Sequence, residues 1–109
     1  MYHLIIYQTS EGKQPFKAWR DKLRKKDPRA VLKINSTLDK VENGNFSDHK
    51  FERSGVWEIR INYGPGYRLY YSVENGKIVL LLIGGDKTTQ SRDIAKAVEY
   101  LKDYKARTK

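Results

Sequence analysis

Three short segments in the second half of the chain, separated by two turn signals, constrain the fold most. Residues 56–63 and 67–73 alternate apolar and polar side chains, as strands do when one face meets a core. Gly64-Pro65-Gly66 separates these two segments, and Asn75-Gly76, a strong hairpin signal, precedes the third. That third segment, residues 78–83, is uninterruptedly apolar, which suits a central strand covered on both faces. The sequence therefore predicts a meander of three antiparallel strands.

The first half of the chain predicts a strand followed by two helices. Residues 2–9 are rich in β-formers and predict an opening strand. A first helix is expected to begin at Gln14-Pro15, because proline loses no hydrogen bond at the first helical position. Asp27-Pro28 ends it and starts a second helix, which stops at Asn43-Gly44. Each helix carries an apolar stripe, formed by Phe16, Trp19 and Leu23 in the first and by Val31, Ile34, Leu38 and Val41 in the second.

The predicted order is β-α-α-β-β-β-α. We read residues 45–55 as a polar connection, and we expect Gly84-Gly85 to break the third strand of the meander. A last helix is expected from about Thr89 to Tyr104, with Ile94, Val98 and Leu101 facing inward. These elements predict a single α+β domain over residues 1–109, a small, mainly antiparallel twisted sheet packed against two N-terminal helices and a C-terminal helix.

Composition limits the chemistry of the chain. Lys and Arg number 22 against 13 Asp and Glu, and a net charge of +9 on 109 residues indicates a polyanionic partner, such as RNA, DNA or an acidic protein. Without cysteine there is no disulfide, thiolate metal site or cysteine nucleophile, and His3 and His49 alone make a poor metal site, so we expect no metal and no cofactor. We expect no signal peptide and no membrane segment, and therefore a cytoplasmic protein.

Strand register predicts where the cations meet. If Ile61 opposes Tyr67 across the glycine turn, then Arg60 lies opposite Arg68 on the face away from the core. Like charges facing each other across strands destabilise a sheet by about 0.2–1 kcal/mol, so the pairing favours an anion site over a structural role. If Glu74 opposes Lys77 in the next hairpin, Arg68 falls opposite Ile83, and the chain leaving that strand brings Lys87 to the same patch.

Other polar residues extend this predicted site. Thr88 or Thr89 is a candidate N-cap, and a helix N-terminus presents free N–H groups to an anion, with Gln90 and Arg92 nearby. Lys50 and Arg53 precede the first strand of the meander and are candidates for binding phosphate. Tyr70 is expected to face outward and stack on a base. We assign Trp19 and Trp57 to the core, and the charges of Lys22, Arg24, Lys25 and Lys26 to a solvated helix face.

Three sequence blocks in a fixed order resemble a known family. They are Val56-Trp57-Glu58-Ile59-Arg60-Ile61, then Tyr63-Gly64-Pro65-Gly66-Tyr67-Arg68, and then residues 80–90, Leu-Leu-Leu-Ile-Gly-Gly-Asp-Lys-Thr-Thr-Gln, leading into Arg92-Asp93-Ile94-Ala95. In these blocks the chain resembles the RelE/HigB-like toxins, in particular the addiction-module killer proteins. The likeness runs from the first strand to about Tyr104.

The resemblance implies the toxin of a type II toxin–antitoxin system, with the RelE-like fold. Such toxins are metal-independent endoribonucleases that cleave messenger RNA, usually at the ribosome, through attack of a ribose 2′-hydroxyl on the adjacent phosphate. By position, Arg60 resembles the residue that helps activate this hydroxyl, Arg68 the one that grips the scissile phosphate, and Lys87 the cation at the leaving oxygen. The resemblance also implies a cognate antitoxin, expected to be a small helix-turn-helix protein.

The proton acceptor and the activity itself stay open at this stage. The C-terminal tyrosine that assists in the best-known RelE toxins has no match here, since Asp93 falls near its position, and arginine and lysine are poor bases at neutral pH. Glu58, Asp93 and His49 are the candidates. Two alternatives to the enzyme are a non-catalytic RNA- or DNA-binding module that uses the same basic face, and an inactive toxin that still binds its antitoxin.

Overall fold

The computed structural model describes residues 1–108, in which five strands and three α-helices form three layers. In chain order the elements are β1 (His3–Ile6), α1 (Pro15–Lys26), α2 (Pro28–Glu42), β2 (His49–Arg53), β3 (Val56–Ile61), β4 (Tyr67–Glu74), β5 (Ile78–Asp86), the short 3-10 helix η1 (Lys87–Thr89) and α3 (Gln90–Arg107). The predicted α+β class is confirmed, with one strand more than the sequence analysis expected.

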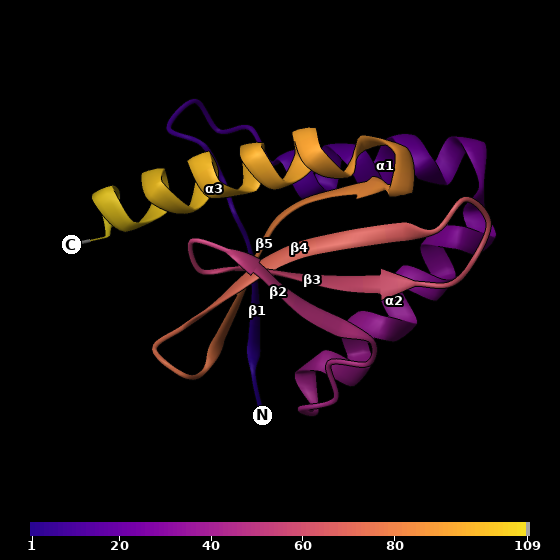
Figure 1. Cartoon of the computed structure of the whole chain (residues 1–109), viewed down its shortest axis with the longest axis horizontal. Coiled ribbons are helices and arrows are strands. Elements are labelled where there is room, and N and C mark those ends of the chain that lie inside the picture. Colours follow the sequence, from indigo (N-terminus) through magenta and orange to yellow (C-terminus); the bar gives the residue numbers. More distant parts are fainter. Residues whose placement is uncertain (109) are drawn as a thin grey trace.

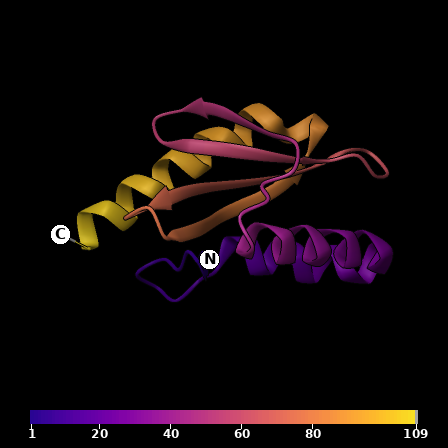
Figure 2. The same ribbon diagram turned by 90° about the horizontal axis from the view of Figure 1, so that it is seen from below.

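The sheet has the strand order β1-β5-β4-β3-β2, with β1 parallel to β5 and the other pairs antiparallel (Figure 1). Helices α1 and α2 lie on one face and α3 lies on the other (Figure 2). Both faces of the central strands are therefore covered, and the molecule has two apolar cores separated by the sheet. None of the helices in residues 1–108 combines the length and the hydropathy that a membrane span requires.

The N-terminal helices begin and end as predicted. Pro15 and Pro28 occupy the first turns of α1 and α2, and the Asp27 side chain caps α2 by accepting a hydrogen bond from the Ala30 N–H. The predicted apolar stripes are buried, apart from Trp19, which is half-buried. They pack on the sheet residues Ile59, Ile61, Tyr67, Leu69, Tyr71, Val79 and Leu81.

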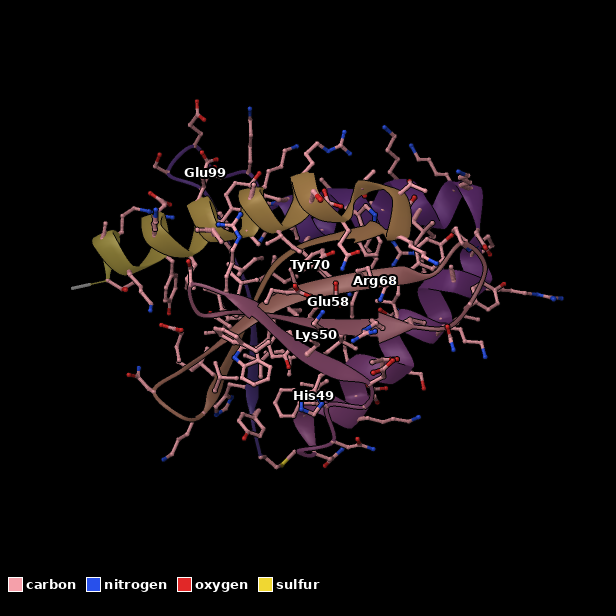
Figure 3. All side chains as sticks on the ribbon, in the orientation of Figure 1. His49, Lys50, Glu58, Arg68, Tyr70 and Glu99 are labelled. Atoms are coloured by element: carbon pink, nitrogen blue, oxygen red, sulfur yellow. The ribbon has the colours of Figure 1, made fainter. Side chains whose placement is uncertain are left out.

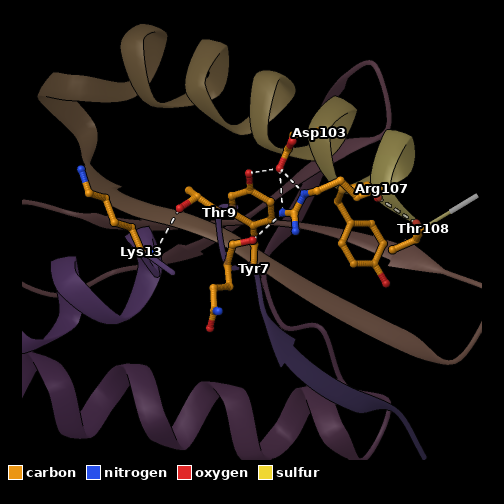
Figure 4. Close-up of polar contacts among 8 residues, drawn as sticks. Tyr7, Thr9, Lys13, Asp103, Arg107 and Thr108 are labelled. Atoms are coloured by element: carbon orange, nitrogen blue, oxygen red, sulfur yellow. Dashed lines mark hydrogen bonds and ion pairs between the residues drawn. The ribbon is translucent and has the colours of Figure 1, made fainter. Parts of the chain in front are cut away.

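The second core lies between the sheet and α3. Its members alternate with those of the first core along the same strands, and they include Val56, Tyr70, Leu80, Leu82, Val98 and Leu101. The last turns of α3 are tied back to the start of the chain (Figure 4). The Tyr7 hydroxyl donates to the Asp103 carboxylate, which also accepts from Arg107, while Arg107 donates to the Gln8 carbonyl. Burial and the bond to Asp103 raise the pKa of Tyr7 to about 12.

Two predictions about the strands were wrong. Residues 49–53, expected to be part of a polar connection, form the edge strand β2, which pairs with β3 through Lys50 opposite Glu58. Gly84-Gly85 does not break β5, which continues to Asp86. Only glycine fits at these two strand positions, because side chains of other elements occupy the space that a Cβ would need. Trp19 lies against Gly84, and Asp93 lies against Gly85.

Candidate functional site

Two arginines face each other across the middle of the site. Arg60 on β3 lies directly opposite Arg68 on β4, as the glycine-turn register predicted. The register of the next hairpin was wrong: Arg68 lies opposite Gly85, and Ile83 lies opposite Tyr70. Glu74 pairs with Ile78, not Lys77, and a bulge between Tyr70 and Tyr71 shifts the pairing by one more residue. The consequence is that Arg68 is brought beside the last residues of β5, close to the start of α3.

A buried carboxylate holds the two arginines in place. The Glu58 side chain is 1% exposed, and its Oε2 lies 3.3 Å from Arg60 Nε and 3.7 Å from Arg68 Nη1. Its Oε1 accepts a 2.8 Å hydrogen bond from Gln90 Nε2, which connects the first turn of α3 to β3. Figure 3 shows Glu58, Arg68 and Tyr70 close together over β3 and β4. The arginines differ in access, since the Arg60 side chain is 39% exposed and that of Arg68 is 12% exposed.

A second carboxyl group lies beside Glu58. Glu52, half-buried on β2, has a raised pKa because burial disfavours its charge and the negative charge of Glu58 lies nearby. Lys50 and Arg60 act in the opposite direction. The sequence analysis missed Glu52, because it treated residues 49–53 as a loop. A strand there would have placed positions 50 and 52 on the same face as Glu58.

This cluster concentrates polar atoms that have no hydrogen-bond partner. Seven buried side-chain nitrogen and oxygen atoms in residues 1–108 lack one, and five of them belong to Glu52, Glu58, Arg60, Arg68 and Tyr70. The Glu58–Arg60 contact is thus an ion pair without hydrogen-bond geometry. Buried polar groups are normally satisfied in a fold, so a cluster that leaves several of them free is better suited to binding a ligand than to stabilising the sheet.

Asp93 fixes the start of α3 against the sheet. Its side chain is almost fully buried, lies directly on Gly85 and accepts a hydrogen bond from the Thr89 hydroxyl. Any residue larger than glycine at position 85 would collide with this carboxylate. Asp93 is therefore a positioning residue for the turn between β5 and α3.

The turn itself carries accessible cations. Residues Lys87–Arg92 line a hollow of about 360 Å³, and the Lys87 and Arg92 side chains are exposed. The Lys87 N–H donates to the Gly66 carbonyl, which attaches this turn to the glycine turn that precedes Arg68. Thr89, one of the two predicted candidates, is the N-cap residue of α3, but its side chain makes no capping hydrogen bond to the helix. The Asp86 side chain caps the 3-10 helix by accepting a hydrogen bond from the Thr88 N–H. The Thr89 hydroxyl lies within hydrogen-bonding distance of the Asp93 carboxylate and the Asp86 carbonyl.

Three predicted positions lie apart from this cluster or in another environment. Tyr70 does not face outward to stack a base: it is 0% exposed, because α3 packs over β4. Arg53 pairs with Val56, at the opposite end of β3 from Arg60. His49 packs against Phe46 and Trp57, side chains of the α1/α2 side of the sheet, so it does not reach the arginines.

The structure therefore brings together most of the predicted site. Lys50 lies opposite Glu58, Gln90 is bonded to it, and Thr88 and Arg92 line the hollow beside Lys87. No group of three or more His, Asp or Glu side chains among residues 1–108 is placed to hold a metal ion. The chemistry available is that of several fixed guanidinium and ammonium groups beside two carboxyl groups.

Comparison with known proteins gives two matches. Residues 16–102 match the sequence profile of a family described as "Phage derived protein Gp49-like (DUF891)". A protein of Haemophilus influenzae, described as an uncharacterized protein, is 46% identical over 82 residues, which cover 75% of this chain and 81% of the relative. The family match spans the cationic cluster and nearly all of the two helices that precede it.

Proposed function

Because the chain belongs to the Gp49-like family of phage-derived proteins, a family of toxin-like proteins in toxin–antitoxin systems, we propose that it is a toxin that cleaves messenger RNA without a metal ion. One observation carries the proposal: Arg60 and Arg68 face each other on one side of the sheet and converge on the buried Glu58 carboxylate. That arrangement costs the sheet stability and prepares a site for a doubly charged phosphate.

The proposed reaction needs positive charge and two proton transfers. The ribose 2′-oxygen forms a bond to the neighbouring phosphorus while the bond from phosphorus to the 5′-oxygen breaks, which leaves a cyclic phosphate and a 5′-hydroxyl. Preorganised cations stabilise the pentacovalent dianion between these states. Arg68, restrained by Glu58, is the phosphate ligand in this scheme, and the more exposed Arg60 contacts the phosphate and the attacking oxygen. Lys87, exposed on the neighbouring turn, protonates the leaving oxygen.

The proton acceptor in this scheme is the Glu52 carboxylate, the more accessible of the pair formed by Glu52 and Glu58. Burial and the nearby negative charge of Glu58 raise the pKa of Glu52, which makes its carboxylate a stronger base than an ordinary glutamate. His49 is excluded as the proton acceptor because it lies on the α1/α2 side of the sheet. Asp93 is excluded because its buried carboxylate accepts a hydrogen bond from the Thr89 hydroxyl. Glu52 is the more accessible member of the pair and takes the proton of the 2′-hydroxyl.

The partners follow from the family and from the charge. Membership of a toxin–antitoxin family implies an antitoxin, for which we propose a small helix-turn-helix protein. A net charge of +9 suits messenger RNA bound in the ribosome, where RNA surrounds the substrate. The proposal places the protein in the cytoplasm, where translation takes place.

The test is cleavage in a reconstituted translation reaction, with mapping of messenger RNA 5′ ends. The wild type is compared with Arg68→Ala and Lys87→Ala, and with Lys102→Ala as a control for loss of an exposed lysine on the outer part of α3. We expect new 5′-hydroxyl ends with the wild type and the control, also in EDTA, and at least about a 100-fold lower rate with the two site variants. Intact RNA beside folded wild-type protein would leave a nucleic-acid-binding module or an inactive toxin as the better description.

A further inference from the structure

A pocket on the opposite face of the sheet from the arginine cluster, where β4 begins and β5 ends, has no role in the scheme above. It has a volume of about 190 Å³ and lies between α1 and the glycine turn. Its walls combine two aromatic rings, Trp19 and Tyr67, with two ammonium groups, Lys22 and Lys26, and the Asp86 carboxylate. The sequence analysis had assigned Trp19 to the core and the two lysines to a solvated surface, so this combination appears only in the folded chain.

The aromatic wall is rigid. One part of the Trp19 ring lies directly on the backbone of Gly84, where even a methyl group would collide with it. Its centroid lies 5.8 Å from that of Phe16 and 6.2 Å from that of Tyr67. Trp19 is nevertheless half-buried, not fully buried, and it lines the pocket. A flat apolar ligand therefore meets a preorganised surface that loses little conformational entropy on binding.

The cations of the pocket are available to an anion. Lys22 and Lys26 are one helical turn apart on α1, so their side chains lie on the same face. The ion pairs formed by α1 within residues 1–108 involve Lys17, Arg24 and Asp21, and neither pocket lysine takes part in them. Lys26 does act on Asp86. Together with hydrogen bonds from Thr88 and Thr89, its charge holds the pKa of Asp86 below the usual range.

The pocket is connected to the arginine cluster through a short segment of chain. Tyr67 lines the pocket, and the next residue, Arg68, points to the opposite face of the sheet. Asp86 lines the pocket, and the next residue, Lys87, is bonded through its N–H to Gly66. A strand of nucleic acid that crosses the turn between β5 and α3 therefore passes from one set of cations to the other.

We propose that this pocket binds one nucleotide of single-stranded RNA, next to the nucleotides held by the arginine cluster. Its base lies against Trp19 and Tyr67, and its phosphate contacts Lys22 and Lys26. Stacking on aromatic side chains and contact with basic groups are the two interactions by which proteins hold single strands. The volume is below the roughly 300 Å³ at which pockets for drug-sized ligands begin, which suits a single base. This inference rests on the proposed function and extends it.

The test measures binding without cleavage. The probe is a hexaribonucleotide with 2′-O-methyl groups, which lacks the attacking hydroxyl, and its affinity is followed by the anisotropy of a dye on its 5′ end. Lys22→Gln/Lys26→Gln is compared with Lys40→Gln/Lys102→Gln, which removes the same charge from exposed positions outside the pocket. Quenching of Trp19 emission in a Trp57→Phe background reports whether the base reaches the pocket, because Trp19 is then the only tryptophan.

We expect the pocket variant to bind about tenfold more weakly than the control variant. We also expect its slope of log affinity against log salt to be smaller by about 0.7, since the pocket holds one phosphate and each phosphate contact to a single strand contributes about 0.7. Trp19 emission is expected to fall on binding. Equal affinities of the two variants, or unchanged Trp19 emission at saturation, would overturn the inference. Its failure is distinct from failure of the proposed function, which is judged by cleavage with the wild type alone.

Discussion

Replacing Glu58 by glutamine tests whether this carboxylate holds the arginines together. The two ion pairs, at 3.3 and 3.7 Å, each have a gross Coulomb energy of about 5 kcal/mol at an effective dielectric constant near 20. Most of that energy is offset by desolvation, and Arg60 is partly screened by solvent. Removing one partner of a fully buried pair costs about 3–5 kcal/mol. Glutamine keeps the shape and the acceptor for Gln90, so we expect Glu58→Gln to lose about 2–3 kcal/mol of unfolding free energy.

Urea unfolding followed by circular dichroism measures this loss, with Glu99→Gln as the matched control. Glu99 is exposed on α3, so its substitution removes the same charge from the surface (Figure 3). The expected loss corresponds to a fall of roughly 10–20 °C in melting temperature for a domain of this size. A Glu58→Gln variant within about 0.5 kcal/mol of the control would refute the idea that the carboxylate organises the two arginines.

Three further substitutions test other parts of the structure. Gly84→Ala places a methyl group in the Trp19 ring, so we expect a loss of about 1–3 kcal/mol in urea unfolding and a shift of tryptophan emission; wild-type values for both would contradict the packing described. Tyr7→Phe removes the bond to Asp103 and should cost about 1 kcal/mol. Because folding raises the pKa of Tyr7 from 10 to about 12, the wild type loses stability as pH rises through this range, and the variant should lose less. Glu52→Gln should be more stable than the wild type at pH 7, and equal to it near pH 3, where the wild-type carboxyl is protonated in both the folded and the unfolded state. The variant should also cleave RNA more slowly. Lower stability of the variant at pH 7 would contradict the raised pKa of Glu52.

Local signals were enough to predict the helices and the first hairpin. Pro15 and Pro28 indicate helix starts because proline fits the first turn of a helix without losing a hydrogen bond. The apolar spacing then identifies the buried face of each helix. The glycine turn fixed the register of Arg60 against Arg68, because a turn of that length leaves one pairing that keeps both apolar faces inward. These predictions depend only on residues that are close in sequence.

The errors came from contacts between residues that are far apart in sequence. Gly84 and Gly85 look like a strand break, but they are strand residues because Trp19 and Asp93, from two different helices, occupy the space above them. Tyr70 looks like an outward residue in an alternating strand, but α3 covers it. Alternation identifies the two faces of a strand, but it does not show that both faces are covered.

The covering helix also explains why the cationic cluster is stable enough to exist. An isolated β3–β4 hairpin would carry Arg60 and Arg68 in contact with water, where their repulsion is screened and their side chains are free to separate. In the folded chain, Gln90 from α3 and Glu58 from β3 enclose the space around Arg68, so the guanidinium groups keep their positions before a ligand arrives. The Glu58 carboxylate carries one negative charge against the two positive charges of Arg60 and Arg68, and the Glu52 carboxylate lies near the positive charge of Lys50. A net positive charge therefore remains at the site, as the proposed phosphate ligand requires. The fold thus holds the two arginines together despite their repulsion, which is the property that the proposed anion site depends on.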